Sequence, residues 1–318
     1  MSINIDDTVS VLAIYSRKNI LKLDFKYICK CMWKGAWFSS KKVSWLKARN
    51  KKQTIPGSKN NISFENQGVK QDLQSFYDKE AKKYAETRKK FWHEEKAILD
   101  EITPLFKEWK KVRVLEFGCW SWRFATLLNH NFTDSFDYVG IDLSDELLSY
   151  ASNDNPNLTF FQWDITKLIK NFEQESFDLI VWTSSFQHIP TTKERSFLMK
   201  NFYRLLDYDG MLLMTNRSLS KWFIKKNWKI VLKARILSWL KFDKEIARDL
   251  LVPRNDNDWK IYDRFYHFFS LKELENLATF SWLTIKTNTY LNDNWEFTDN
   301  EKISRSSLFV ATKTPIKW

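Results

Sequence analysis

The chain of 318 residues is long enough for one large α/β domain with an extension, and 43% of its residues are apolar. Its 51 Lys and Arg residues against 39 acids give a formal net charge of +12, which favours polyanions such as RNA or anionic membrane surfaces. The three cysteines, Cys29, Cys31 and Cys119, exclude a paired disulfide framework and a four-cysteine metal site, so we expect a reducing, cytoplasmic location and no metal. Neither a membrane-spanning run nor a secretory signal is evident, because no apolar stretch is long enough and acids precede the first basic residues.

Glycine is scarce and tryptophan is abundant. The chain has 6 Gly and 16 Trp, whereas average usage would give about 22 glycines at this length. Several tryptophans stand where a turn would use glycine: Trp120 and Trp122 after a predicted strand, Trp163 before an acid, and Trp259 and Trp295 among Asp and Asn. We hypothesise that the gene uses UGA as a glycine codon and that most of these positions are glycine in the natural protein. A lineage rich in tryptophan is the alternative, which explains the number but not the positions.

Residues 1–70 form a basic N-terminal extension and a linker. Residues 17–52 hold twelve Lys or Arg against the single acid Asp24, and the polar, turn-rich stretch KKQTIPGSKNNISFENQG follows. This composition is typical of an RNA-binding arm and equally of a solvated tail without function. Both interpretations stay open at this point.

From residue 71 to 314 the pattern predicts one domain. A charged amphipathic pattern that begins at Asp72 predicts two successive helices. Ile98, Leu99 and Ile102 of the second helix are expected to face inward. Strands and helices then alternate, which predicts a doubly wound, Rossmann-like α/β sheet with mostly parallel strands. The predicted strands are 112–117, 137–142, 158–162, 177–183 and 211–216, and the helices lie near 122–129, 145–152, 166–171 and 192–206.

A helical and aromatic insertion interrupts this alternation at about residues 217–270. It contains a basic amphipathic stretch, 221–244, which fits contact with a tRNA backbone, a helix on a membrane surface, or a buried structural face. A helix, 271–280, and two strands, 283–290 and 306–313, then complete a seven-stranded sheet with an antiparallel C-terminal hairpin strand.

The first strand, VRVLEF, carries Glu116 near its end and continues into GCWSWRFATLL. With glycine at positions 120 and 122 this segment has the spacing G-x-G-x-G and opens a helix, so that backbone N–H groups can approach a ligand closely. A dinucleotide site would instead have G-x-G-x-x-G. Acidic or polar residues also end the next three strands, where open α/β sheets bind ligands.

In these features the chain resembles the class I S-adenosylmethionine-dependent methyltransferases of type 11, over about residues 72–314. The resemblance implies S-adenosyl-L-methionine as the cofactor. It implies that Glu116 orients the amino-acid end of the cofactor, that Asp142 binds the ribose hydroxyls, and that Asp164 and Ile165 contact the adenine. The other cofactor-binding positions that it implies are Gly118, Cys119, Trp120, Trp122, Leu143 and Thr183.

More narrowly, the segments FYDKEAKKYAETRKKFW, SSFQHI and LLVPRNDNDWKIYDRFYHFFSLKELENL are similar to the wobble-uridine carboxymethyl tRNA methyltransferases related to the AlkB-homologue methyltransferase domain. This resemblance implies Arg88, His188 and Arg264 as catalytic residues, Tyr266 and His267 as substrate contacts, tRNA as partner, and a possible small zinc-containing activator protein. An ordinary surface charge is the alternative for each arginine, and helix capping for His188.

A carboxymethyl group on uridine needs no general base to accept a methyl group, because a carboxylate with a pKa of about 4 is already ionised at neutral pH. The protein would then mainly align oxygen, carbon and sulfur. Two other functions stay open: methylation of a small molecule such as a quinone or lipid precursor, and RNA binding without catalysis if Trp120 and Trp122 are genuine.

Overall fold

A computed structural model describes residues 64–87, 94–107, 111–120, 122–243, 245–256 and 259–314. Apart from residues 170–173, the described residues belong to one compact unit. Most of the basic extension, including Cys29 and Cys31, lies outside the described residues, and so does the predicted catalytic residue Arg88. No helix in the described part of the chain is long and apolar enough to cross a membrane.

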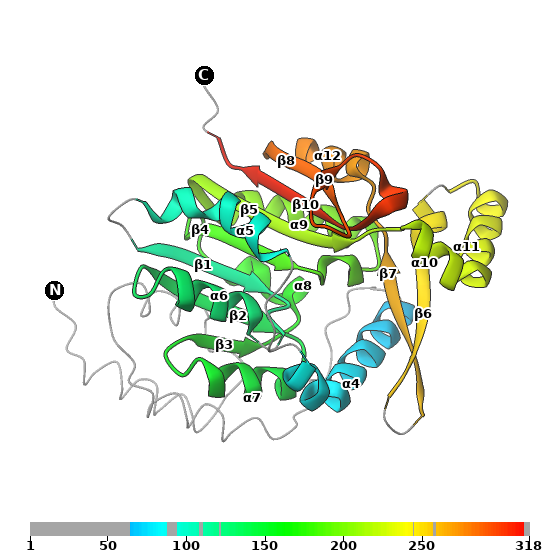
Figure 1. Ribbon diagram of the computed structural model, residues 1–318, viewed down its shortest axis with the longest axis horizontal. Helices are drawn as coiled ribbons and strands as arrows, with labels where there is room; N and C mark the ends of the chain where they lie inside the picture. The colour runs from blue at the N-terminus through cyan, green and yellow to red at the C-terminus, as the bar shows by residue number, and fades with distance from the viewer. Residues whose placement is uncertain are drawn as a thin grey trace. The chain divides into compact units, whose positions relative to one another are not determined.

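Helices and strands alternate along the chain as Figure 1 shows. The elements are α4 (Phe64–Thr87), α5 (Glu95–Ile102), η2 (Thr103–Phe106), β1 (Val112–Phe117), α6 (Arg123–Asn131), β2 (Phe136–Asp142), α7 (Asp145–Asp154), β3 (Thr159–Gln162), α8 (Ile165–Leu168), η3 (Ile169–Asn171), β4 (Phe177–Thr183), η4 (Phe186–His188), α9 (Thr192–Leu205), β5 (Leu206–Arg217), α10 (Lys221–Lys226), α11 (Trp228–Lys241), η5 (Glu245–Arg248), β6 (Asp249–Asn255), β7 (Ile261–His267), α12 (Leu271–Phe280), β8 (Thr284–Asn292), β9 (Phe297–Thr298), η6 (Glu301–Ile303) and β10 (Ser304–Thr312).

Eight strands form the main sheet, in the order β3-β2-β1-β4-β5-β10-β8-β9. The strands β1 to β5 pair in parallel, and β10 lies antiparallel between β5 and β8. The doubly wound, mostly parallel sheet with antiparallel C-terminal strands is therefore confirmed, with the two-residue strand β9 added to the seven predicted strands. Because the chain order reverses between β1 and β4, the carboxyl ends of these strands form the position at which such sheets bind ligands.

The sheet is buried on both faces. Along β1, Val112 and Val114 pack with the apolar sides of α5 and α6, whereas Phe117 points to the opposite face and stacks on Phe202 of α9, with ring centroids 5.6 Å apart. The alternation follows from the period of two in a strand, and parallel strands covered by helices need apolar residues on both faces. The predicted inward residues Ile98 and Ile102 are fully buried in α5.

The helix α4 begins earlier than the sequence predicts. Its first residue, Phe64, lies inside the segment that we expected to be linker up to residue 70. Polar residues and Gly68 in its first turn predict a loop, but tertiary packing overrides this local preference. The aromatic residues Phe76 and Tyr77 are buried where α4 packs against α7 and β7.

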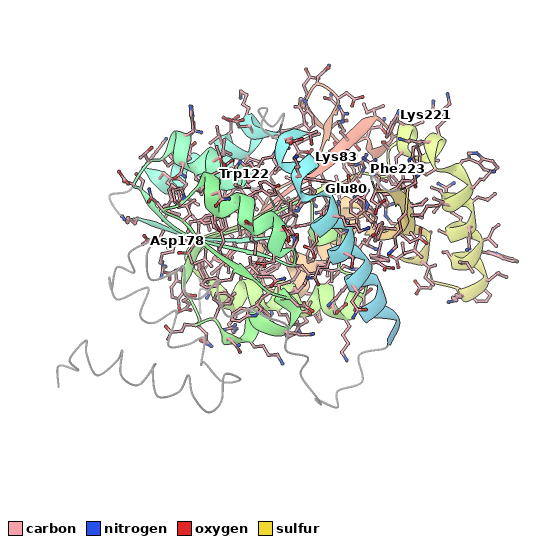
Figure 2. The ribbon with its side chains drawn as sticks, turned by 90° about the horizontal axis from the view of Figure 1, so that it is seen from below. Glu80, Lys83, Trp122, Asp178, Lys221 and Phe223 are labelled. Atoms are coloured by element: carbon pink, nitrogen blue, oxygen red, sulfur yellow. The ribbon has the colours of Figure 1, made fainter. Side chains whose placement is uncertain are left out.

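The insertion between β5 and α12 contains a second, two-stranded sheet that the sequence analysis missed. The aromatic run expected as part of a helical and aromatic segment is the strand β7, paired antiparallel with β6. A small apolar core joins this hairpin to α10 and α11, and its members include Phe223, Val231, Leu250 and Phe268. In Figure 2, Phe223 and Lys221 are labelled on α10, where Phe223 is buried in this core and Lys221 is exposed.

Left-handed backbone conformations coincide with tryptophan. Ten non-glycine residues in the described part of the chain have positive φ, and five of them are tryptophans with φ between 51° and 77°. A bulky residue in this region is a genuine outlier, since each costs about 1–2 kcal/mol, whereas glycine adopts the same conformation freely. The five are Trp120, Trp122, Trp259, Trp282 and Trp295.

Three of these tryptophans occupy turns that characteristically use glycine. Trp282 follows the C-cap of α12, and the N–H groups of Trp282 and Leu283 donate to Thr279 and Ala278, which is the Schellman arrangement. Trp259 and Trp295 each occupy the fourth position of a hairpin turn with the same pair of backbone hydrogen bonds. The coincidence of position and conformation favours the glycine hypothesis over simple tryptophan enrichment. Trp282 had not been singled out from the sequence.

If Trp282 is strained, its replacement by glycine will stabilise the protein. Trp282 is 68% exposed, so Trp282→Gly removes little packing while relieving the left-handed strain. We expect the free energy of unfolding to rise by about 1 kcal/mol. The matched control is Trp239→Gly, at an exposed position inside α11, where glycine should lower the free energy of unfolding by about 0.5 kcal/mol. Denaturant unfolding measures both, and a loss of stability at position 282 would contradict the argument.

The glycine hypothesis also predicts the composition of the natural protein. Peptide mass spectrometry on the protein from its source organism is expected to find glycine at positions 120, 122, 259, 282 and 295. These are the positions at which the backbone requires a left-handed conformation. Tryptophan at 120 and 122 would refute the hypothesis at the two positions that precede α6 and shape the predicted cofactor site.

Candidate functional site

A cleft opens at the carboxyl ends of β1, β2 and β4, and α4 forms its outer wall. The empty space within it is about 740 Å³, including the open mouth. The residues predicted as site residues that line it are Gly118, Trp120, Asp142, Leu143, Asp164, Ile165 and His188. The structure therefore brings together residues from four successive strand ends and the loops that follow them.

The turn after β1 forms the floor of this cleft. Gly118 has a φ of +59°, and a Cβ atom at this position would lie 2.1 Å from Ser185 Oγ, so no other residue fits. Two residues later, the backbone N–H of Trp120 donates to Asp142 Oδ2 at 3.0 Å. The Trp120 indole extends to α4, where its ring centroid lies 5.5 Å from that of Tyr77 and 5.6 Å from that of Tyr84.

Asp142, at the end of β2, is the buried carboxylate of the cleft. Its two oxygens accept backbone N–H bonds from Trp120 and, at 2.9 Å, from Ser144. Burial raises the pKa of Asp142 to about 6, although these backbone hydrogen bonds favour the ionised form. Each carboxylate oxygen has a further lone pair, so Asp142 can still accept hydrogen bonds from a ligand in the cleft.

Four other predicted cofactor residues lie beneath or beside the cleft and do not line it. Glu116 is buried and accepts a hydrogen bond from the Tyr138 hydroxyl, and burial raises the pKa of Glu116 well above its ordinary value. Thr183 hydrogen-bonds to the same carboxyl group. Cys119 is buried, and the Trp122 ring packs into the core near Tyr150. These residues hold the turn in place from below.

The resemblance implies that residues 76–92 flank the acceptor pocket, but the α4 side chains that line the cleft were not named as site residues. Lys70, Gln74 and Tyr77 line the cleft from positions spaced four and three apart, which places them on one face of the helix. The Lys70 ammonium donates to Thr166 Oγ1 and Glu194 Oε1, each at 3.0 Å, and lies 3.5 Å from Asp164 Oδ2. Asp164 also caps α8 by accepting from the Thr166 N–H, so this acid serves both the local structure and the cleft wall.

His188 lies at the inner end of the cleft, in the loop after β4. Its Nδ1 donates to the Phe265 carbonyl oxygen at 2.7 Å, and burial lowers its pKa to about 3, so the ring is neutral. The other ring nitrogen, Nε2, is buried and has no hydrogen-bond partner among the described residues. A neutral imidazole whose Nδ1 holds the proton presents Nε2 as an acceptor.

Arg264, on β7, is a buried cation behind His188 and Tyr77. Its guanidinium lies 4.9 Å from the Phe76 ring centroid and 5.2 Å from that of Tyr266, and it donates a long hydrogen bond of 3.5 Å to the Tyr77 hydroxyl. Burial opposes its charge, but the facing tyrosines outweigh this effect and raise its pKa. Within the described residues no ion pair with a carboxylate is found for it, and its Nε has no hydrogen-bond partner.

The two predicted substrate contacts differ in their surroundings. Tyr266 packs edge-on against His188, with ring centroids 4.5 Å apart, but does not itself line the cleft. His267 is fully buried, with Asp249 Oδ1 2.6 Å from Nδ1 and Glu273 Oε1 2.7 Å from Nε2, and it does not line the cleft. Both ring nitrogens of His267 contact protein carboxylates, and through Glu273 this residue joins β7 to α12.

The described residues contain no group of three or more His, Cys, Asp or Glu side chains that could hold a metal ion. The cleft instead combines a bare glycine turn with the buried carboxylate of Asp142, and the buried cation of Arg264 lies behind its lining residues Tyr77 and His188.

Comparison with known proteins identifies the domain that contains the cleft. Residues 115–214 match the family model described as a methyltransferase domain. The comparison with curated proteins gave no match. The chain contains a class I S-adenosylmethionine-dependent methyltransferase domain.

Solved structures share the fold of this methyltransferase domain. One is a SAM-dependent methyltransferase from Methanosarcina mazei, with 19% identity, a TM-score of 0.50, and coverage of 67% of this chain and 97% of that chain. A Haloferax volcanii methyltransferase in complex with the Trm112 activator has 13% identity, a TM-score of 0.52, and coverage of 77% and 99%. The DhpI-SAM-HEP complex has 14% identity, a TM-score of 0.53, and coverage of 79% and 99%.

The cofactor of the methyltransferase domain is S-adenosylmethionine. The residues on the β2 side fit it, because Asp142 has lone pairs for ribose hydroxyls and Gly118 leaves the floor bare. The indole of Trp120 does not fit as well, since it occupies the space between this floor and α4. Glycine at position 120 would keep the N–H bond to Asp142 and remove the obstruction.

The raised pKa of Asp142 predicts a pH dependence of cofactor binding. The ribose hydroxyl groups need the ionised form of Asp142 as their hydrogen-bond acceptor. This form is the main one only above a pH of about 6. With glycine at positions 120 and 122, the affinity for S-adenosylmethionine is expected to be constant above pH 7 and to fall by up to about tenfold per pH unit below 6. Calorimetry at several pH values measures this. Asp142→Asn should bind weakly at all of them, and an unchanged pH profile in this variant would assign the effect to another group.

Proposed function

We propose that this methyltransferase domain methylates the carboxylate of a carboxymethyl group on a wobble uridine of tRNA. The observation that supports the proposal most strongly is Arg264, a buried guanidinium that lacks a carboxylate partner among the described residues. It lies directly behind Tyr77 and His188, which line the cleft.

A buried cation without a counter-ion is costly, because the protein interior solvates charge poorly. The faces of Phe76 and Tyr266 compensate Arg264 in part through cation–π attraction. A carboxylate on the acceptor would complete the compensation with charge-assisted hydrogen bonds, for which the planar guanidinium is well suited. The surroundings of Arg264, the proposed anion pocket, therefore favour an anionic acceptor.

The Trp120 side chain separates this anion pocket from the donor side of the cleft. Its indole fills the space beside Tyr77 and Tyr84, two residues whose hydroxyl groups face Arg264. Glycine at position 120 would connect the two sides, so that an acceptor oxygen held near Arg264 could reach the transferable methyl group. The proposed activity thus depends on the glycine hypothesis.

The chemistry of the pocket favours a carboxylate over an acceptor that must lose a proton. S-adenosylmethionine, when bound, supplies an electrophilic methyl group on a sulfonium. His188 is the titratable side chain at the inner end of the cleft lining, and with a pKa of about 3 it is a very weak base. A carboxylate with a pKa of about 4 is already ionised and needs no base. The acceptor atom His188 Nε2 also suits an N–H donor, which a uracil ring carries.

A tRNA acceptor agrees with the net charge of +12, because neutralisation of phosphates supplies most of the affinity of such proteins for nucleic acids. The Haloferax volcanii structure that shares this fold is a complex with the Trm112 activator. We extend the proposal to an activator of this kind, and addition of such a protein to the assay below tests it.

The second candidate is methylation of a small anionic molecule. Arg264 would bind any carboxylate or phosphonate of suitable size, and the DhpI-SAM-HEP complex shares the fold of this domain. The two candidates differ in the acceptor that is consumed, so one assay can separate them.

The test uses the full chain with glycine at positions 120, 122, 259, 282 and 295, labelled S-adenosylmethionine, and bulk tRNA or a metabolite extract. We expect label in tRNA that mild base releases, because a methyl ester hydrolyses while a methyl group on nitrogen or carbon does not. Nucleoside mass analysis then identifies the modified uridine. Label in metabolites alone would support the second candidate and refute the first.

The role of Arg264 is tested by Arg264→Met. We expect kcat/KM for the acceptor to fall about 100-fold, equivalent to a charge-assisted hydrogen bond of about 2–3 kcal/mol, with no change in the affinity for S-adenosylmethionine. Arg305→Met is the matched control, since Arg305 is an exposed residue of β10 with a surface ion pair to Asp293. Equal effects of the two substitutions would show that Arg264 does not bind the acceptor.

A further inference from the structure

The helices α10 and α11 expose a large apolar surface that neither the fold nor the proposed activity uses. Within α11 only Val231 and Ala234 are buried. The exposed large apolar side chains of the two helices and the residue after them are Trp222, Trp228, Leu232, Ile236, Leu237, Trp239, Leu240 and Phe242. Scattered exposed apolar residues are ordinary, but a contiguous group of this size marks an interaction surface.

These side chains form a stripe along one side of α11. Leu232, Ile236 and Leu240 are spaced four residues apart and therefore stack on the same face, where they are 49%, 49% and 58% exposed. With 100° per residue, this face lies opposite Val231 and Ala234, which attach the helix to the rest of the insertion. The stripe consequently faces away from the β6–β7 hairpin.

Positive charge surrounds the stripe. Residues 221–241 contain seven Lys or Arg residues and no acid. Lys229 and Lys233 border the stripe directly, together with Leu232 and Ile236, in a shallow surface depression on α11. A lysine beside an apolar stripe can lay its alkyl chain on the stripe and keep its ammonium group in a polar layer.

We propose that α10 and α11 attach the protein to an anionic lipid bilayer, with the stripe in the interfacial region and the lysines among the headgroups. The combination of exposed Leu, Ile, Trp and Phe with unopposed Lys and Arg is what such an interface requires. The attachment is peripheral, because no helix in the described part of the chain is long and apolar enough to span a membrane.

Other occupants fit this surface less well. RNA would neutralise the cations, but aliphatic side chains such as Leu232, Ile236 and Leu240 offer no ring on which bases stack. A second copy of the chain would bring two sets of seven cations together. The inference does not depend on the glycine hypothesis, because the three aliphatic residues and the seven cations remain if Trp222, Trp228 and Trp239 are replaced.

The experiment measures co-sedimentation of the full chain with vesicles of phosphatidylcholine containing about 30 mol% phosphatidylglycerol, and with pure phosphatidylcholine vesicles. We expect the partition constant to be at least about tenfold higher for the anionic vesicles. The combined variant Leu232→Ser, Ile236→Ser and Leu240→Ser should lower it about tenfold or more, since it removes the apolar contribution. The matched control places serine at three exposed apolar positions on other elements, Ile261, Phe297 and Ile303.

Thermal unfolding of each variant confirms that it is folded, and tRNA binding of the same variants is measured in parallel. Binding to vesicles that survives the triple substitution, or that is as strong on pure phosphatidylcholine, would overturn the proposal. Loss of tRNA binding with unchanged vesicle binding would assign the surface to RNA and overturn it as well. A loss of vesicle binding in the α11 variant alone, with methyl transfer unaffected, would support it.

Discussion

Between β1 and α6 the chain must leave the sheet, pass the end of β2 and start a helix within five residues, and the N–H groups of Cys119, Trp120 and Trp122 all donate to acceptors within the protein. It does so with positive φ at residues 118, 120 and 122. Left-handed conformations at alternate positions turn the backbone tightly and direct the N–H of residue 120 toward Asp142. At Gly118 a Cβ atom would collide with the Ser185 side chain, so the floor is bare at this position. The indoles at 120 and 122 are directed toward α4 and into the core. The shape of the whole cleft therefore depends on what occupies these two positions.

The electrostatics of the cleft follow from unequal burial of its charged groups. Burial and the nearby charge of Asp142 raise the pKa of Glu116 well above its ordinary value, whereas burial raises the pKa of Asp142 only to about 6. The negative charge of the cleft consequently resides on Asp142. On the opposite side, Arg264 keeps its positive charge, and the neutral His188 stands between them. This polarity suits a cationic donor on the β2 side and an anionic acceptor on the β7 side.

The main sheet could be predicted because its strands carry strong local signals. Val112 to Phe117 and Phe177 to Thr183 are continuous apolar runs bounded by polar turns, and the helices between strands show clear amphipathic spacing. The β6–β7 hairpin could not be predicted, since β6 is mostly exposed and its partner contains charged residues that find their environment only after folding. The α4 side chains that line the cleft could not be predicted for the same reason. Lys70 and Tyr77 face the cleft because α4 packs on α7 and β7, a contact between segments far apart in sequence. His267 shows the opposite error, because sequence position places it beside Tyr266, whereas strand alternation turns it toward Asp249 and Glu273.

In the proposed function, donor binding and acceptor selection reside in different parts of the chain. The donor side is built from the ends of β1, β2 and β3, the part of the sheet that shows the most regular alternation of strand and helix. The acceptor side depends on Arg264 and Tyr266, which belong to the insertion between β5 and α12 together with the exposed basic surface of α10 and α11. The small core that includes Phe223, Leu250 and Tyr266 packs the two parts of the insertion together. In this arrangement the sheet binds the common donor, and one inserted segment carries both the proposed acceptor contacts and the proposed attachment surface. Changes in that segment can therefore set the location and the acceptor of the reaction without any change at the donor site.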